Sequence, residues 1–387
     1  GRTSHSAIMA RSMGIPAIVG AGEKADEIAD GDLLLIDGAA GEVVAQPDEQ
    51  TLADFAERQK ADAAHRAMLA QYKDKEGATS DGRRVIIEGN IGTPDDAVRV
   101  AELGGEGVGL FRSEFLFMDR TDLPSEEEQF AAYKKACEIM QGKPVIIRTL
   151  DIGGDKEVPA LALEKEQNPF LGYRAIRICL NQPELFLIQL RALLRAAQYG
   201  DLRIMFPMIS SVDEVRGAKQ VLEQAKDMLT AEGVPFNPNV KVGIMVEIPV
   251  AAVCADVLAK EVDFFSIGTN DLIQYSCAVD RINEKISYLY RPLHPGVLRL
   301  IAMTAKAANE NGIEVGVCGE MAGTAGMAPV LCGLGVTNLS MSASAMLAAK
   351  ADLAKHSCGE CKELADKLLA CASASDAERI FADWRES

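Results

Sequence analysis

Eight short apolar runs, separated by stretches of helical periodicity, constrain the fold more than any other feature of this chain. Near-continuous apolar runs that alternate with helices are typical of parallel strands buried on both faces. Eight such units over about 270 residues favour closure into an α/β fold of the (β/α)8 barrel type over an open doubly wound sheet. The predicted strands are 85–87, 107–111, 145–147, 202–206, 242–246, 264–267, 315–317 and 339–341.

Capping sequences between the runs predict where some of the helices begin. Ser125 and Ser211 each precede a glutamate by three residues, which is the pattern of a capping box. Thr93-Pro94 offers a capping hydroxyl followed by a proline in the first turn. We therefore expect helices to start directly after these positions.

The part of the chain before the barrel divides into two further segments. Residues 1–46 read as a loop, a short helix, a strand over 16–20 and a hairpin formed by 32–37 and 42–45. Residues 47–77 read as a linker helix that ends at Gly77, and the barrel would occupy 78–387. Because the chain lacks an initiator Met and begins inside a loop, we expect it to be a fragment cut within a domain.

Composition excludes several classes of partner. The net charge of −17 argues against binding to nucleic acid or to an anionic membrane, and no uncharged apolar run is long enough to span a bilayer. Nine cysteines without a disulfide framework fit a reducing cytoplasm. Cys358 and Cys361 form a C-x-x-C near His356 and Cys371, but a second ligand pair is missing, so a zinc site is not expected.

His5 follows the small polar residues Gly1-Arg2-Thr3-Ser4 and precedes an apolar helical pattern. A histidine presented at a helix N-terminus suits nucleophilic attack on an anionic group, because its neutral ring is available near pH 7. A helix-capping loop with an incidental histidine explains the same residues. From this stretch alone the two interpretations are equally good.

Charged and polar side chains follow the predicted strands, where barrel enzymes hold their reacting groups. Arg112 and Arg148 could clamp phosphate or carboxylate oxygens, while Glu247 and Asp271 are suitable ligands for Mg²⁺. Cys318 could donate a proton to an enolate. A ring of salt bridges and a structural cysteine are the alternatives. The full set is Glu88, Asn90, Arg112, Ser113, Glu114, Arg148, Asp151, Lys156, Glu247, Asn270, Asp271, Cys318, Gly319 and Glu320.

The chain resembles enzyme I of the bacterial phosphotransferase system, the phosphoenolpyruvate–protein phosphotransferases, from residue 1 to about residue 355. As a set the shared motifs are highly specific. They are the segments 1–5, 109–118, 148–156, 168–172, 245–247, 268–272, 278–281 and 318–320.

The resemblance implies an enzyme that moves the phosphoryl group of phosphoenolpyruvate onto His5, releases pyruvate and passes the group to the carrier protein HPr for sugar uptake. It implies that 1–46 is part of a swivelling phosphohistidine domain and that the barrel binds phosphoenolpyruvate and forms a homodimer. The family's HPr-docking region would precede residue 1, so we expect this chain to bind phosphoenolpyruvate without completing the relay. The implied roles are phospho-acceptor for His5, proton donor for Cys318, substrate binding for Arg112, Arg148, Lys156, Asn270, Asp271 and Arg281, and Mg²⁺ binding for Glu247 and Asp271.

Two other functions remain open at this point. A pyruvate phosphate dikinase or phosphoenolpyruvate synthase combines a similar histidine loop and barrel with an ATP-binding domain, so dependence on ATP would separate it from enzyme I. A non-catalytic module that binds phosphoenolpyruvate and dimerises is the alternative from another class.

Overall fold

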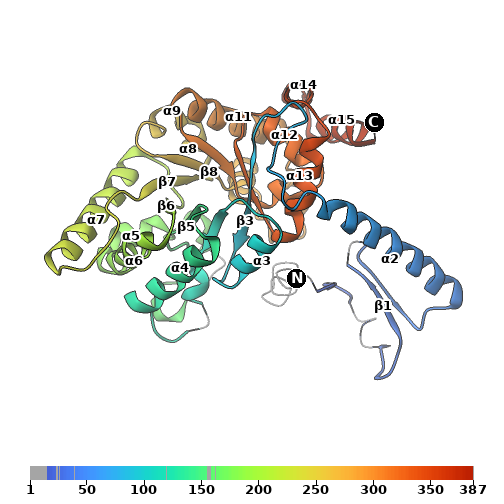
Figure 1. Ribbon diagram of the computed structural model, residues 1–387, viewed down its shortest axis with the longest axis horizontal. Helices are drawn as coiled ribbons and strands as arrows, with labels where there is room; N and C mark the ends of the chain where they lie inside the picture. Colours follow the sequence, from blue (N-terminus) through green and yellow to red (C-terminus); the bar gives the residue numbers. More distant parts are fainter. Residues whose placement is uncertain are drawn as a thin grey trace. The chain divides into compact units, whose positions relative to one another are not determined.

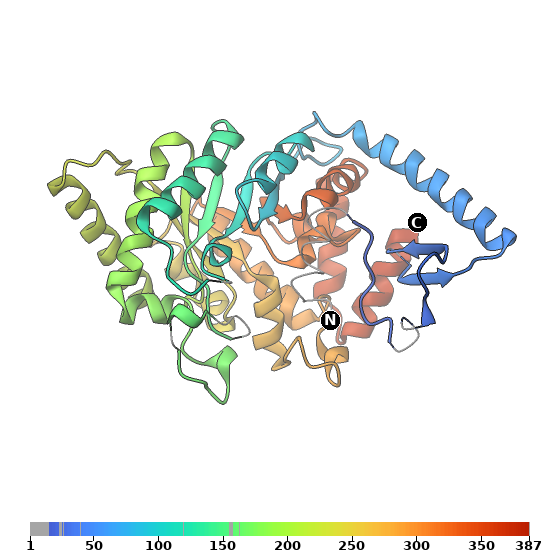
Figure 2. The same ribbon diagram turned by 90° about the horizontal axis from the view of Figure 1, so that it is seen from below.

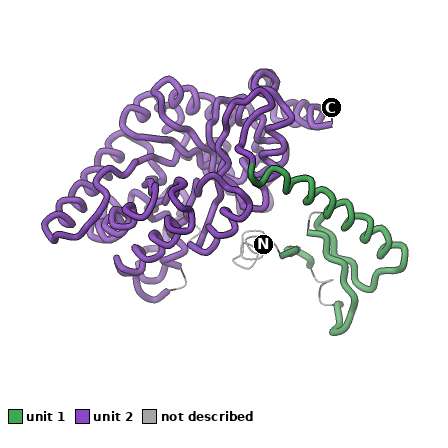
Figure 3. Tube along the Cα trace, viewed as in Figure 1, with its two compact units in different colours: residues 1–74 green, residues 75–387 purple. Residues whose placement is uncertain are grey.

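The computed structural model describes residues 15–22, 25, 27–38, 40–118, 120–154, 158–161 and 163–386. The chain forms two compact units, residues 1–74 and residues 75–387 (Figure 3). The division between them falls a few residues before the boundary near residue 78 that the sequence suggests.

The first unit contains a β-hairpin. Strands β1 (Leu34–Asp37) and β2 (Glu42–Ala45) pair antiparallel, as predicted from two short runs separated by a Gly-containing turn. Gly41 in the turn has a φ of +71°, a left-handed conformation that glycine adopts at little cost. The predicted strand at 16–20 is wrong, because this segment is irregular and pairs with neither hairpin strand.

Helix α2 (Glu49–Ala70) follows the hairpin. Its N-cap Asp48 accepts a hydrogen bond from the backbone N–H of Thr51 at 2.8 Å. The predicted end at Gly77 is wrong, since the helix stops at Ala70 and a series of turns continues to residue 75. Within the first unit α2 buries none of its residues, so no packed core holds its last turns in a helical conformation.

The second unit is a closed barrel of eight parallel strands, which lie at the centre of the unit with helices around them (Figure 1). Each predicted apolar run overlaps a strand. The strands neighbour one another in chain order, with β10 closing the barrel against β3. The strands are β3 (Ile86–Ile91), β4 (Val108–Arg112), β5 (Val145–Arg148), β6 (Leu202–Phe206), β7 (Lys241–Val246), β8 (Phe264–Ile267), β9 (Glu314–Val317) and β10 (Asn338–Met341).

The outer layer consists of α-helices (Figure 2), and short 3-10 helices lie in the connections of the unit. The α-helices are α3 (Asp96–Glu102), α4 (Glu126–Met140), α5 (Ile176–Asn181), α6 (Pro183–Ala196), α7 (Val212–Ala231), α8 (Pro249–Val253), α9 (Ala255–Leu258), α10 (Thr269–Cys277), α11 (Pro295–Glu310), α12 (Met327–Gly333), α13 (Met346–Ala354), α14 (Cys358–Leu369) and α15 (Ala374–Glu386). The 3-10 helices are η2 (Ser113–Leu116), η3 (Pro159–Leu161), η4 (Pro169–Leu171), η5 (Ala197–Tyr199), η6 (Ser287–Leu289), η7 (Glu320–Gly323) and η8 (Ala343–Ala345).

Two of the three predicted helix starts are correct. Ser125 and Ser211 form complete capping boxes with Glu128 and Glu214 at the starts of α4 and α7. The start at Thr93-Pro94 is wrong by two residues. There the side chain of Asp96 accepts hydrogen bonds from the backbone N–H groups of Gly92 and Thr93, so α3 begins only at Asp96.

Alternation along the strands separates two cores. The larger core fills the space between the strands and the helices, whereas a small cluster occupies the inside of the barrel. The inner cluster consists of Leu110, Ile146, Met205, Met245, Phe264 and Cys318. These side chains pack the interior of the barrel, so it is not an open channel. Among the described residues, no helix is long and apolar enough to cross a membrane.

Candidate active site

The carboxyl ends of the strands bring the predicted polar residues to one mouth of the barrel. Arg112 and Arg148 are the last residues of β4 and β5, and Glu247 and Cys318 directly follow β7 and β9. All strands run in the same direction, so residues at these positions meet although they are far apart in the chain.

Arg148 is buried and holds two carboxylates. Its guanidinium forms ion pairs with Glu114 in η2 and with Asp151 in the loop after β5, the latter at 2.8 Å. Burial by itself lowers the pKa of Arg148, but the Asp151 and Glu114 carboxylates outweigh this effect and raise it. The arginine is therefore a permanent cation with a fixed orientation.

Arg112 differs from Arg148 because it makes no hydrogen bond or ion pair with any described residue. Burial lowers its pKa, and the neighbouring Arg148 cation adds to this effect while Glu114 opposes it. Two arginines close together, one of them without a partner among the described residues, would suit an anion with several oxygens.

Arg174 is a member of the site that the sequence analysis missed. It is 3% exposed and forms ion pairs with Asp151 at 2.9 Å and Asp271 at 3.3 Å. Its side chain also donates a hydrogen bond to the hydroxyl of Tyr275 at 3.0 Å. Arg174 lies two residues beyond the motif 168–172, so extending that motif would have found it.

Gly153 allows the loop that carries Arg174 to close. Its φ is +103°, and a Cβ atom at this position would lie 2.5 Å from the Cβ of Arg174. A residue with a side chain would be strained there and would push the arginine away from Asp151.

Glu247 and Asp271 place two carboxylates side by side. Glu247 is 1% exposed, and its Oε1 accepts a hydrogen bond from the backbone N–H of Met208 at 2.6 Å. Burial raises the pKa of Glu247 to about 8, and the Asp271 and Asp151 carboxylates add to the shift. A Cβ on Gly268 would lie 3.0 Å from Glu247 Oε2, so this glycine lets the carboxylate approach the start of α10.

Asp271 keeps one oxygen available at the mouth. Its Oδ2 pairs with Arg174, whereas its Oδ1 is buried and accepts no hydrogen bond from the described residues. Arg281 forms an ion pair with Oδ1 at 4.0 Å. Two oxygen ligands on a dry surface suit a hard cation that keeps waters or substrate oxygens at its other positions. Among the described residues no group of three or more His, Cys, Asp or Glu side chains could hold a metal ion.

Cys318 is 2% exposed at the base of the mouth. Burial raises the pKa of its thiol to about 11, while a hydrogen bond with Ser266 and the Arg148 cation lower it and Glu247 raises it. The thiol therefore carries its proton at neutral pH and can act as an acid.

The loop after β9 is joined to the start of α10. The backbone N–H of Glu320 donates a hydrogen bond to Asn270 Oδ1 at 3.0 Å. Gly319 packs so closely that an added Cβ would lie 1.9 Å from Thr269 Oγ1. These contacts fix Cys318, Asn270 and Asp271 relative to one another.

Several buried polar atoms around the mouth have no hydrogen-bond partner among the described residues. Buried polar groups in native structures nearly always have partners, so such a cluster indicates a bound ligand or water. The atoms are Arg148 Nε, Thr149 Oγ1, Arg174 Nε, Thr269 Oγ1, Asp271 Oδ1 and Gln274 Nε2.

Two candidate residues from the sequence, His5 and Lys156, fall outside the described residues. Glu88 is not at the mouth, because β3 continues past the predicted end at Ile87 and carries Glu88 in its middle, facing the barrel interior. The strand accommodates this carboxyl group because Gly107 and Gly109 of the next strand region leave space for it.

Comparison with known proteins identifies the family. The PEP-utilising enzyme, PEP-binding domain matches residues 66–358, and the PEP-utilising enzyme, mobile domain matches residues 1–41. The chain is 52% identical over 376 residues to the phosphoenolpyruvate-protein phosphotransferase of Priestia megaterium, a match that covers 97% of this chain and 66% of that protein.

Relatives of the same name match at similar levels. The Bacillus subtilis (strain 168) protein is 51% identical, and the match covers 100% of this chain and 67% of the relative. The Staphylococcus carnosus (strain TM300) protein is 48% identical, with 100% and 68% covered. This chain thus spans about two thirds of the length of these relatives. The chain belongs to the PEP-utilising enzymes and, among them, to the family of phosphoenolpyruvate-protein phosphotransferases.

Proposed function

We propose that this protein transfers the phosphoryl group of phosphoenolpyruvate to His5, with pyruvate as the product and HPr as the next acceptor. The observation that carries the proposal is the unpartnered Arg112 guanidinium beside Arg148, within a mouth where buried polar atoms lack described partners. Such a surface suits a small polyanion whose oxygens would complete these hydrogen bonds.

Substrate binding is assigned to cations on both sides of the mouth. Arg112 and Arg148 would hold phosphate and carboxylate oxygens as bidentate forks, and Arg281 would add charge beside Asp271. Asn270 retains its side-chain N–H₂ group for the substrate, since its Oδ1 is already engaged by the backbone of Glu320. Lys156 is proposed as a further contact.

Glu247 and Asp271 are proposed to hold Mg²⁺. The fit rests on the raised pKa of Glu247, which reflects burial together with the neighbouring Asp271 and Asp151 carboxylates. It also rests on Oδ1 of Asp271, which accepts no hydrogen bond from the described residues. When bound, the ion would neutralise negative charge on the phosphoryl oxygens and on the developing enolate.

Cys318 is proposed to complete the formation of pyruvate. As the P–O bond breaks and the phosphoryl group reaches a ring nitrogen of His5, the remaining enolate gains electron density at its methylene carbon. The S–H bond of Cys318 then breaks, its proton forms the new C–H bond, and a thiolate remains. The high pKa of Cys318 keeps the proton on sulfur until this carbon becomes basic.

His5 is proposed as the acceptor because it lies within the segment that matches the mobile domain. An acceptor on a separate unit can move between the donor site and a carrier protein, which supports the division into a phosphohistidine segment 1–46, a linker 47–77 and a barrel 78–387. Neutral imidazole is nucleophilic near pH 7 and gives a phosphohistidine that can be passed on.

Homodimerisation through the barrel is also proposed. Val250, Val253 and Val257 on α8 and α9 are 45%, 57% and 42% exposed, and they lie on neighbouring turns that a second copy could cover. Nine free thiols support a reducing compartment such as the cytoplasm.

Calorimetric titration of phosphoenolpyruvate tests the substrate site. We expect binding that requires Mg²⁺ and that Arg112→Met weakens about 10- to 100-fold, because charge-assisted hydrogen bonds contribute about 1.5–3 kcal/mol. Arg216→Met is the matched control, since Arg216 is 65% exposed and pairs with Glu261 on the outside of the barrel. Equal binding with and without Mg²⁺, or equal affinity of the two variants, would contradict the assignment.

Intact-mass measurement after incubation with phosphoenolpyruvate and Mg²⁺ tests the acceptor. We expect a phosphoryl adduct that His5→Ala abolishes while substrate binding persists. An adduct that forms only when ATP is supplied would point to a dikinase or synthase. Binding without any adduct would favour the non-catalytic module.

A further inference from the structure

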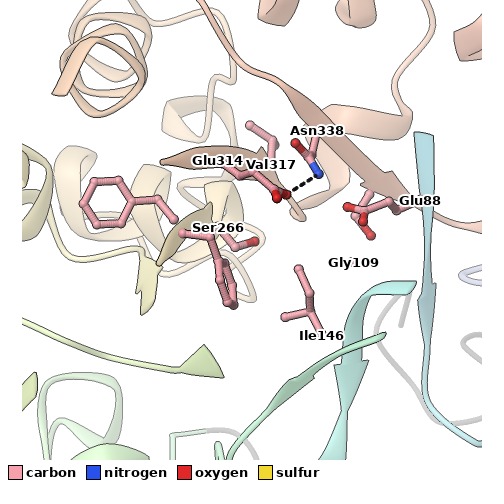
Figure 4. A pocket seen from close by; sticks show the side chains of 11 residues that line it. Glu88, Gly109, Ile146, Ser266, Glu314, Val317 and Asn338 are labelled. Atoms are coloured by element: carbon pink, nitrogen blue, oxygen red, sulfur yellow. Dashed lines mark hydrogen bonds between the residues drawn. The ribbon is translucent and has the colours of Figure 1, made fainter. Parts of the chain in front are cut away.

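A small cavity with both apolar and polar lining residues lies inside the barrel, apart from the mouth (Figure 4). Its volume of about 10 Å³ is the space that one water molecule occupies. The lining residues that carry polar side chains are Glu88, Ser266, Glu314, Asn338 and Ser340. A cavity with this lining meets the requirements for an ordered water, namely sufficient volume and several hydrogen-bonding partners.

Glu88 is the titratable group of this cavity. It is 2% exposed, and its Oε1 has no hydrogen-bond partner among the described residues. Burial raises the pKa of Glu88 to about 7, with Glu314 and Glu106 adding to the shift and Arg203 and a hydrogen bond with Asn338 opposing it. The carboxyl group can therefore both give and accept a proton near neutral pH.

Cys318 lies beside the cavity, because Ile146 and Phe264 line the cavity and belong with Cys318 to the inner cluster. Ser266 also lines the cavity, and the Cys318 thiol donates a hydrogen bond to the carbonyl of Ile267, the residue after Ser266, at 3.7 Å. The backbone of Cys318 is held from the same side, because Asn90 Nδ2 donates to its carbonyl at 2.9 Å and Ser340 Oγ donates to Asn90 Oδ1 at 2.6 Å. A hydroxyl that lines the cavity next to the residue bound by the thiol is placed to pass a proton between the cavity and the sulfur.

The other end of the cavity reaches solvent at the amino-terminal ends of the strands. Glu314 and Asn338 line both the cavity and an open pocket of about 460 Å³ that also includes Arg84 and Asn309. Asn338 Nδ2 donates to Glu314 Oε2 at 3.4 Å, as the dashed line in Figure 4 marks, and the Glu314 side chain is 38% exposed. This pair separates the interior from water by a single layer of side chains.

We propose that Glu88 is the group that returns a proton to Cys318 from inside the barrel, through one water and the hydroxyl of Ser266. The proposal rests on the proposed function, in which Cys318 becomes a thiolate when it protonates the enolate. The proton of the Glu88 carboxylic acid moves to the water, the water gives a proton to Ser266 Oγ, and Ser266 gives its own hydroxyl proton to the sulfur. The products are a Cys318 thiol and a Glu88 carboxylate, which regains its proton from solvent past Glu314.

A route from inside the barrel would serve Cys318 because, in the proposed function, the product occupies the mouth when the thiolate forms. Cys318 is 2% exposed, so its sulfur has little direct contact with solvent. A path from the opposite end lets the thiol regain its proton while pyruvate is still bound.

Hydrogen–deuterium exchange at the methyl group of pyruvate tests the path without phosphoryl transfer. In D₂O with Mg²⁺, the protein should enolise pyruvate reversibly, and deuterium should enter the methyl group only when the Cys318 proton exchanges with solvent. Glu88→Gln should lower the rate of deuterium uptake at least about tenfold without changing pyruvate affinity, and Ser266→Ala should act in the same way. Glu310→Gln, on the exposed surface of α11, is the matched control.

The results of the exchange experiment distinguish the Glu88 relay from the role of Cys318 as proton donor. Deuterium uptake by Glu88→Gln at the wild-type rate would overturn the relay while leaving Cys318 as the proton donor. No uptake by the wild-type protein that still binds pyruvate would refute the role of Cys318 and the relay with it. Infrared spectroscopy of the wild-type protein and of Glu88→Gln adds a second readout, and the comparison is required because Glu247 is another buried carboxyl group with a raised pKa. We expect a carboxylic acid band that disappears between about pH 6 and about pH 8 in the wild-type protein and is missing from Glu88→Gln. A difference spectrum without such a band would exclude Glu88 as the donor.

Discussion

Replacement of Arg174 by methionine tests how the charges at the mouth are balanced. The Arg174 side chain is 3% exposed, and its guanidinium pairs with Asp151 and Asp271 at 2.9 and 3.3 Å. Methionine keeps the apolar stem but removes the cation. Two buried carboxylates then lose a partner in a region that already contains Glu247.

The expected loss of stability depends on the ion pairs that remain after Arg174→Met. Removal of one partner from a buried pair costs about 3–5 kcal/mol, since an uncompensated charge stays in a dry environment. Asp151 would keep its ion pair with Arg148 at 2.8 Å, and Asp271 would keep Arg281 at 4.0 Å. We therefore expect a loss of about 3 kcal/mol in the free energy of unfolding, at the lower end of that range.

Urea denaturation of the metal-free protein provides the measurement. Fluorescence of Trp384, the only tryptophan, reports on the barrel unit because it lies in α15. The midpoint should fall with an unchanged slope, which indicates lower stability of the same folded state. Arg216→Met removes a pair whose arginine is 65% exposed and should cost at most about 1 kcal/mol. Equal losses in the two variants would refute the inference that Arg174 neutralises a buried acidic cluster.

Three further predictions follow from single positions. Cys318→Ala should reduce pyruvate formation about 100-fold or more, measured by coupled reduction of pyruvate, and leave phosphoenolpyruvate affinity nearly unchanged; equal losses would indicate a structural cysteine. Gly153→Ala should destabilise the barrel by about 1–3 kcal/mol in urea denaturation, because its φ of +103° is strained for alanine and Arg174 is too close. Gly142→Ala is the control: its φ is +87° and it has no described neighbour within 4 Å, so it should cost only about 1 kcal/mol. Glu88 has a folded pKa of about 7, above about 4.3 in the unfolded chain, so the folded state binds the extra proton and this group's contribution to stability decreases as pH rises from about 4.5 to about 7. Glu88→Gln should flatten that decrease in urea titrations across this range, and a parallel pH profile would show that Glu88 does not titrate there.

Most of the barrel could be predicted from the sequence because buried parallel strands leave a simple pattern. The predicted run 202–206 has the same bounds as β6, and 264–267 has the same bounds as β8. The prediction for β3 stopped at Ile87 because Glu88 and Asn90 are polar. Two tertiary features explain why polar side chains continue this buried strand. Gly107 and Gly109 leave space for Glu88, and Asn90 donates a hydrogen bond to the carbonyl of Cys318.

The sequence likewise determined one part of the candidate site, and the tertiary structure determined the rest. The sequence by itself determined that Arg112, Arg148, Glu247 and Cys318 follow strands, and parallel strands require their carboxyl ends to meet at one mouth. It could not determine which arginine is paired and which is free, since that depends on contacts between distant segments. Tertiary structure decided that Arg174 joins Asp151 to Asp271 and that Glu88 faces the interior, because burial and ion pairing arise only when those segments pack together.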